Sequence, residues 1–125
     1  MLDELYESDV KLGVLSNKPH EFTKLFVEHF FQHHKFDSVY GQRDGFKKKP
    51  DPTVLRSIVL ELGSCEETTF YVGDSGVDMQ TARNCGVKAV GVSWGFRSPE
   101  ELIAHQADII VNHPQEIAEY VLSST

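Results

Sequence analysis

Short apolar runs alternate with longer amphipathic stretches along this chain. The short runs are rich in valine and isoleucine and end at glycine or polar residues, which is typical of strands. The longer stretches repeat apolar residues at the spacing of one helix face. The pattern predicts strands at 11–15, 38–41, 69–72, 88–92 and 107–111, and helices at 19–33, 51–62, 77–84 and 114–122, with a further helix beginning at Pro99. This alternation favours an α/β domain with a parallel sheet.

Helix-end signals support several of these boundaries. Ser98 and Glu101 form a capping-box pattern, with Pro99 at the first helical position. Gly63 and Gly86 follow two of the predicted helices, where glycine adopts the left-handed conformation that ends a helix. No linker interrupts the pattern, so residues 1–125 are expected to form one domain.

Charge and cysteine content narrow the choice of partners and setting. The chain has 125 residues and a formal net charge of -7, which argues against nucleic acid and anionic membranes because both attract clustered lysine and arginine. A small phosphorylated metabolite remains compatible, since one basic group and a metal ion can reverse the field inside a cleft. Cys65 and Cys85 form no CxxC motif, and neither a signal peptide nor an apolar run of membrane-spanning length is visible. These features predict a reduced, cytoplasmic setting.

Two candidate clusters combine phosphate-binding groups with a turn. Ser16 and Asn17 follow the predicted strand 11–15, where a hydroxyl and a backbone N–H could bind a phosphate oxygen. The same residue types are also favoured as plain helix N-caps. Lys49 lies in the run 47–52, where prolines stiffen the turn and a lysine could neutralise a transferring phosphoryl group. This run could equally be a solvated charged segment that precedes a helix.

A third cluster holds two carboxylates. Asp74 and Asp78 lie one helical turn apart at the turn that follows the predicted strand 69–72. Such a pair could share one magnesium ion, which prefers few carboxylates together with water and phosphate oxygens. Alternatively, both acids only complement the dipole at a helix start. Gly73 favours the metal site because glycine lets the backbone approach closely.

Taken in order, these clusters resemble a known set of motifs. LGVLSNKP, KKKPDP and YVGDSGVDM look like the second, third and fourth motifs of the haloacid dehalogenase superfamily of phosphotransferases. The stretches AVGVSWGFRSPEEL and ADIIVNHPQEI are similar to its subgroup of phosphoglycolate phosphatases and pyrophosphatases. The resemblance covers essentially the whole chain. It implies a Rossmann-like three-layer α/β sandwich with a mainly parallel sheet and the activity of a magnesium-dependent phosphomonoester hydrolase.

The resemblance also implies a role for each candidate residue. Catalytic roles would fall to Lys49, Ser16 and Asp78, and phosphate binding to Ser16, the Asn17 amide and Lys49. Asp74 and Asp78 would form the site for Mg²⁺, with Asp78 orienting Asp74, Lys49 or a metal-bound water. In the family the reaction passes through an aspartyl-phosphate, which water then hydrolyses.

The chain departs from the family at its first motif, Asp-x-Asp, whose first aspartate is the nucleophile. No aspartate in residues 1–125 is followed by another two positions later, and the family's helical cap is absent from these residues. We therefore expect a partial catalytic core, a fragment missing its first, central strand. By resemblance that strand would lie between 11–15 and 69–72. The chain alone is expected to be inactive and to self-associate through exposed sheet edges.

Two other functions stay open. A receiver-like phospho-acceptor module shares the length, acidity and α/β pattern, although a receiver has its acidic cluster early and its lysine late, whereas Lys49 precedes Asp74 here. A non-catalytic pseudo-enzyme retained as a binding subunit is the other alternative. The sequence does not choose among phosphoglycolate, pyrophosphate and small sugar phosphates as substrates.

Overall fold

The computed structural model describes residues 5, 8, 10–19, 36–42, 47–95 and 98–124. Strands and helices alternate through them as the sequence predicts. In chain order the elements are β1 (Gly13–Pro19), β2 (Ser38–Gln42), α3 (Thr53–Glu61), the short 3₁₀ helix η1 (Glu66–Thr68), β3 (Phe70–Gly73), α4 (Gly76–Cys85), β4 (Lys88–Val92), α5 (Pro99–Ala104), β5 (Ile109–Val111) and α6 (Pro114–Ser123). None of these helices is long and apolar enough to cross a membrane.

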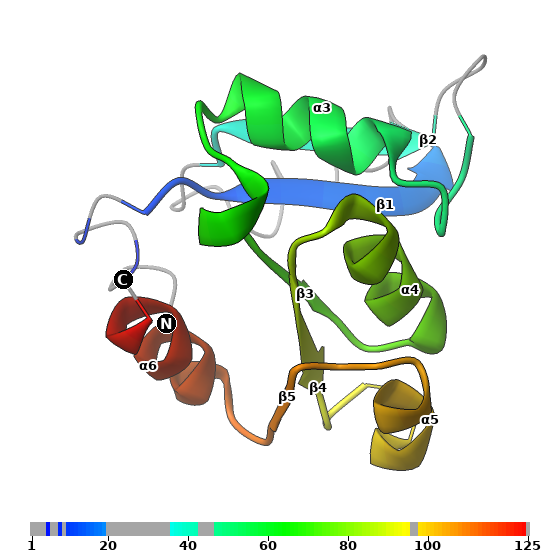
Figure 1. The fold of residues 1–125 in the computed structure, drawn as a ribbon, viewed down its shortest axis with the longest axis vertical. Coiled ribbons are helices and arrows are strands. Elements are labelled where there is room, and N and C mark those ends of the chain that lie inside the picture. The colour runs from blue at the N-terminus through cyan, green and yellow to red at the C-terminus, as the bar shows by residue number, and fades with distance from the viewer. Residues whose placement is uncertain are drawn as a thin grey trace.

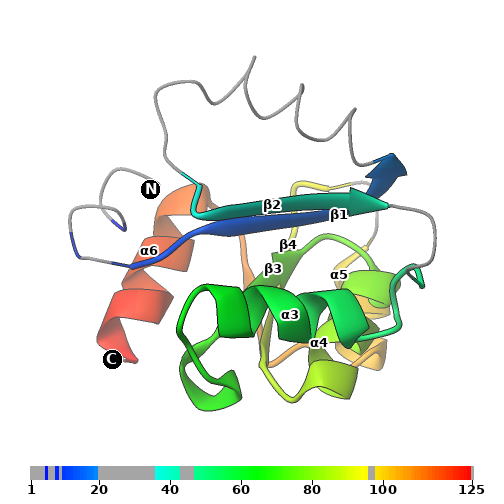
Figure 2. The same ribbon diagram turned by 90° about the horizontal axis from the view of Figure 1, so that it is seen from above.

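The strands form two separate parallel sheets in the described part of the chain. β1 pairs with β2, with Gly13 opposite Ser38. The second sheet has the order β3–β4–β5, with Phe70 opposite Lys88 and Val90 opposite Ile109. Figure 2 shows β1 and β2 side by side, apart from β3 and β4. The parallel α/β fold is therefore confirmed, and the break between β1 and β3 lies where the resemblance places the missing strand.

Helices cover both faces of the β3–β4–β5 sheet. Figure 1 shows α6 on one side of this sheet and α4 and α5 on the other. The strand pleat explains the sorting, because successive side chains point to opposite faces. Ala89 of β4 packs in the cluster that contains α3, α4 and α5 side chains, whereas Val90 and Val92 pack in the cluster formed by α6. Each face therefore has its own apolar core, as a three-layer sandwich requires.

The predicted helix ends are largely confirmed. The Ser98 Oγ accepts a hydrogen bond from the Glu101 backbone N–H, and Pro99 begins α5. Gly63 and Gly86 both adopt positive φ angles, 68° and 84°, just after α3 and α4. The buried stripe of α3 consists of Val54, Leu55, Ile58 and Val59.

One predicted boundary is wrong. β1 continues to Pro19, whereas the sequence pattern ends this strand at residue 15 and begins a helix at Pro19. Pairing with β2 carries the extended backbone onward: after a shift of register beyond Leu15, Pro19 lies opposite Gln42. Ser16 and Asn17 therefore lie within the strand. The rest of the predicted helix 19–33 lies outside the described residues.

A neighbouring pair in α5 provides a test of the core. Leu102 is fully buried, whereas 62% of Ile103 is exposed. Leu102→Ala should lower the free energy of unfolding by about 2–5 kcal/mol, because it leaves a cavity between α5 and the sheet. Ile103→Ala should change it little. Urea unfolding followed by circular dichroism compares the two variants, and equal effects would contradict the packing described above.

Candidate active site

The turn from β3 into α4 positions the acidic residues of the candidate site. Ser75 is the N-cap of α4, with an extended backbone, and its Oγ accepts a hydrogen bond from the Asp78 N–H at 3.2 Å. This cap satisfies one of the backbone donors that a helix start leaves without partners. Asp78 lies in the first helical turn, where a negative charge also complements the helix dipole. Local helix-start chemistry therefore fixes the position of Asp78.

Glycine at position 73 lets the strand and the helix meet. A Cβ atom on Gly73 would lie 2.6 Å from the Asp78 Cγ, which is closer than real contacts allow. The absence of a side chain thus permits the Asp78 carboxylate to fold back over the end of β3. The close backbone approach expected from the sequence is confirmed at this residue.

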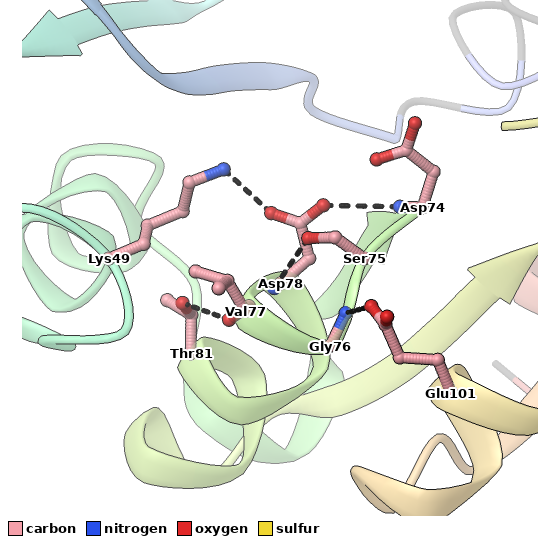
Figure 3. A network of polar contacts seen from close by, with 8 residues as sticks. All are labelled: Lys49, Asp74, Ser75, Gly76, Val77, Asp78, Thr81 and Glu101. Atoms are coloured by element: carbon pink, nitrogen blue, oxygen red, sulfur yellow. Dashed lines mark hydrogen bonds and ion pairs between the residues drawn. The ribbon is translucent and has the colours of Figure 1, made fainter. Parts of the chain in front are cut away.

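The Asp78 carboxylate joins the lysine turn to the end of β3. Its Oδ1 accepts a hydrogen bond from the Lys49 Nζ at 2.6 Å, and its Oδ2 accepts one from the Asp74 N–H at 3.1 Å. Figure 3 shows Lys49 and the Asp74 backbone reaching Asp78 from two different segments. Only 13% of the Lys49 side chain and 10% of the Asp78 side chain are exposed, so water screens this ion pair weakly. Both oxygens of Asp78 are already engaged in holding other groups.

The Asp74 carboxylate lies differently. In Figure 3 it points away from Asp78, and no hydrogen bond to it from a described residue is found. Gly95, in the loop after β4, packs against it: a Cβ there would lie 2.5 Å from the Asp74 Oδ2. The described residues contain no cluster of three or more His, Cys, Asp or Glu side chains suited to a metal ion. One available carboxylate beside a second, engaged one nevertheless fits magnesium, which binds through one or two carboxylates and completes its shell with water and phosphate.

Hydrogen bonds just after Lys49 hold its turn in place. The Asn84 Nδ2 of α4 donates to the Pro50 carbonyl at 3.0 Å. The Asp51 Oδ1 accepts from the Thr53 N–H at 2.9 Å, and hydrogen bonds from Thr53 lower the pKa of Asp51. Lys48 is exposed, whereas the neighbouring Lys49 points inward to Asp78. The run 47–52 is thus more than a solvated charged segment.

Tyr71 is a neighbour of the site that the sequence analysis missed. Its ring lies on β3, with the Lys49 Nζ 5.9 Å from the ring centroid. Burial raises the pKa of Tyr71 well above its usual value of 10, and the negative charge of Asp78 raises it further. The Tyr71 phenol therefore stays protonated and neutral near pH 7. A tyrosine inside an apolar strand gives no sequence signal of this kind, because its pattern is that of a core residue.

The structure brings together three of the five residues predicted for the site. Lys49, Asp74 and Asp78 meet through the carboxylate of Asp78. Ser16 lies in the second half of β1. Asn17 lies in the same strand, and its side chain is outside the part of the chain that the structure describes. Phosphate binding by Ser16 and Asn17 stays a prediction.

Known proteins match this chain in sequence. The family model for haloacid dehalogenase-like hydrolases matches residues 1–92. The chain is 33% identical over 109 residues to a phosphoglycolate phosphatase of Salmonella paratyphi A, covering 87% of this chain and 43% of that protein. It is 30% identical over 106 residues to an N-acetylmuramic acid 6-phosphate phosphatase of Pseudomonas aeruginosa, covering 84% of this chain and 47% of that one. The chain thus spans less than half the length of both relatives.

A solved structure extends the match to the fold. A protein of Lactobacillus delbrueckii subsp. bulgaricus named "putative phosphoglycolate phosphatase" superposes with a TM-score of 0.90 at 38% identity. The match covers 96% of this chain and 50% of that one. Since the family model matches well over half of the residues and the same fold recurs in this relative, the chain belongs to the haloacid dehalogenase-like hydrolase family.

Proposed function

We propose that this chain is the larger part of the catalytic core of a magnesium-dependent phosphomonoester phosphatase of the phosphoglycolate phosphatase type. The observation that carries the proposal is the arrangement of Lys49, Asp78 and Asp74 at the end of β3. One carboxylate holds a lysine and a backbone amide, which leaves the second carboxylate available to a cation. Two relatives that are named as phosphatases match most of this chain, and they support the same function.

Each of these side chains has its own task in the proposal. Asp74 is the metal ligand, because its carboxylate points away from the Lys49–Asp78 pair. Asp78 is a positioning residue that fixes the Lys49 ammonium and the backbone of Asp74. Lys49 carries three donor hydrogens, and one of them reaches Asp78. Its charge stabilises the negative charge that develops during phosphoryl transfer.

The remaining groups bind the phosphate and supply the charge balance. Ser16 and the Asn17 amide, in the second half of β1, are proposed to hold phosphoryl oxygens. Bound magnesium would neutralise charge on the phosphoryl group and the attacking carboxylate. The attacking carboxylate, which forms the aspartyl-phosphate, is proposed to come from outside residues 1–125, because these residues contain no Asp-x-Asp motif.

The proposed substrate is a small phosphorylated metabolite in the cytoplasm. Phosphoglycolate is the first candidate, from the name of the Salmonella relative, and a phosphorylated sugar is the second, from that of the Pseudomonas relative. The match to a hydrolase family favours this function over a receiver module. The buried Lys49–Asp78 pair favours it over a pseudo-enzyme.

Loss of the proposed ligand should weaken metal binding. Asp74→Asn removes the charge of the available carboxylate. We expect the affinity for Mn²⁺, a paramagnetic substitute for Mg²⁺, to fall at least about tenfold. Even residues that only support a metal ligand change metal affinity by about 10–100-fold when they are replaced. Line broadening of the Gly73 and Ser75 amide signals in NMR spectra measures this, with competition by Mg²⁺. Glu119→Gln, on the exposed face of α6, removes the same charge far along the chain and is the control. Equal broadening in the unaltered chain, Asp74→Asn and Glu119→Gln would overturn the assignment of Asp74.

A further inference from the structure

A carboxylate from α5 meets the start of α4 beside the candidate site. The Glu101 Oε2 accepts a hydrogen bond from the Gly76 backbone N–H at 2.8 Å. Figure 3 shows the Glu101 side chain reaching across from α5 to Gly76. The two residues are 25 positions apart in the sequence, so this contact is tertiary and is not part of a local helix cap.

Gly76 lies midway between the two aspartates of the site. It follows Asp74 by two residues and precedes Asp78 by two. The Asp74 N–H donates to the Asp78 Oδ2 at 3.1 Å, and the Ser75 Oγ accepts from the Asp78 N–H at 3.2 Å. Residues 74–78 thus close into a compact segment, named the acidic turn below. A contact that fixes the Gly76 amide limits the movement of both aspartates.

The Gly76 amide needs an acceptor from outside its own helix. Gly76 is the first residue of α4, where a helix leaves its backbone N–H groups without intrahelical partners. The local cap, the Ser75 Oγ, accepts from the Asp78 N–H instead. Gly76 is also buried, and a buried backbone donor without a partner is costly. The carboxylate of Glu101 therefore supplies what the sequence around α4 does not.

α5 is packed so closely that the position of Glu101 is well defined. A Cβ atom on Gly76 would lie 2.6 Å from the Nδ1 of His105, the residue that ends α5. Leu102, next to Glu101, is fully buried. The Ser98 Oγ accepts a hydrogen bond from the Glu101 N–H at 3.2 Å. The backbone of Glu101 is thus held from its own helix while its carboxylate reaches α4.

The chain between β4 and the first turn of α5 contacts the acidic turn at a second point. Gly95 packs against Asp74, since a Cβ on Gly95 would lie 2.5 Å from the Asp74 Oδ2. One contact therefore borders the carboxylate that is available to a cation. The other contact, from Glu101, holds the backbone that carries this carboxylate.

We propose that Glu101 is a positioning residue of the candidate site, which holds the acidic turn from α5 and thereby fixes the direction of the Asp74 carboxylate. It acts through the Gly76 backbone and not as a metal ligand, because the described residues contain no cluster of three or more side chains suited to a metal ion. The consequence for metal binding rests on the proposed function. The hold on the turn does not.

Two conservative variants of the 125-residue chain separate reach from charge. Glu101→Gln loses the charge but keeps a side-chain oxygen at the same distance from the backbone, which can accept from Gly76. Glu101→Asp keeps the charge but is one methylene shorter. Glu100→Asp is the matched control, because Glu100 is exposed and lies in the same first turn of α5.

Amide hydrogen exchange measures the hold on the acidic turn. In Glu101→Asp, exchange should accelerate at least about tenfold at Gly76, and also at Asp74 and Asp78, whose N–H groups bond within the turn. Glu101→Gln should keep most of the protection, and Glu100→Asp should keep all of it. The Val90 amide, in the central strand of the β3–β4–β5 sheet, should keep its rate in every variant, which excludes general unfolding.

Mn²⁺ affinity in the same variants measures the consequence for the metal site. Glu101→Asp should bind Mn²⁺ about tenfold more weakly than the unaltered chain, as residues that only support a metal ligand do when they are replaced. Glu101→Gln should lose less affinity, although it loses more charge. Glu100→Asp should not change the affinity.

Four outcomes would overturn the proposal. The first is full protection of the three amides in Glu101→Asp. The second is acceleration confined to Gly76, since the contact would then be only local. The third is an effect of Glu101→Gln as large as that of Glu101→Asp, because charge rather than reach would then matter. The fourth is unchanged Mn²⁺ affinity despite faster exchange. An unaltered chain that binds no Mn²⁺ would instead contradict the proposed function, and the exchange rates would still decide whether Glu101 holds the turn.

Discussion

Purified residues 1–125 should hydrolyse p-nitrophenyl phosphate with magnesium no faster than buffer does. Covalent phosphoryl transfer needs a carboxylate held in line with the leaving oxygen, and such positioning is worth roughly 7–11 kcal/mol. Release of nitrophenolate, followed by absorbance, measures the rate. A chimera in which these residues replace the matched half of the Lactobacillus delbrueckii protein is the positive control.

The described aspartates explain why none of them replaces the missing nucleophile. Asp37 and Asp108 accept hydrogen bonds from the backbone N–H groups of Leu12 and Ala89, which holds them at strand starts. Asp51 accepts from the Thr53 N–H before α3, and Asp78 is bound to Lys49. Asp74 is the proposed metal ligand. Magnesium-dependent turnover by a monomer of this chain would refute the prediction and would identify another residue as the nucleophile.

Features that depend on neighbours along the chain could be predicted from the sequence. The Ser75 cap, the first turn of α4 and the left-handed Gly86 after it all follow from residues within one helix. β4 begins and ends at the predicted residues 88 and 92, because its apolar run is bounded by polar residues. The same local signals located Asp74 and Asp78. Short-range chemistry alone thus gave the centre of the candidate site.

Several features that depend on distant segments could not be predicted, although the resemblance implied the contact between Asp78 and Lys49. β1 runs through Ser16 to Pro19 because β2 supplies a pairing partner, and nothing in the local sequence shows that partner. The place of Tyr71 beneath Lys49 joins a strand to a turn many residues earlier. The hydrogen bond from Asn84 to the Pro50 carbonyl also joins segments that are far apart in the sequence. Tertiary contacts therefore determine all three features.

The gap between β1 and β3 connects the fold to the expected behaviour of the chain. Gly13, Leu15, Phe70 and Val72 turn their N–H and C=O groups toward a cavity with apolar walls. A polar backbone group that is buried without a partner costs about 1–3 kcal/mol, so water must enter the cavity or another strand must fill it. If water fills the gap, the contact between the β1–β2 sheet and the β3–β4–β5 sheet is weakened. We therefore expect a strand that pairs within this gap to stabilise the chain and to limit its self-association.

The chimera should lose most of its activity when Lys49 is replaced. Lys49→Ala removes the ammonium that Asp78 holds at the site, and removing one well-placed donor of transition-state charge stabilisation typically costs about 2.7–4 kcal/mol, or roughly 10²–10³-fold in kcat. Lys48→Ala is the matched control, because Lys48 is exposed and adjacent in sequence, and its kcat should not change.

A stability measurement separates this loss from unfolding. Lys49→Ala also leaves the buried Asp78 carboxylate without its cation, which should lower the free energy of unfolding by roughly 3 kcal/mol. Combining it with Asp78→Asn removes the unpaired charge and should restore part of that stability without restoring kcat. The role of Lys49 would be refuted if Lys49→Ala kept the kcat of the unaltered chimera, or if the double variant regained both stability and turnover. Recovery of stability alone would show that the loss of turnover does not result from unfolding.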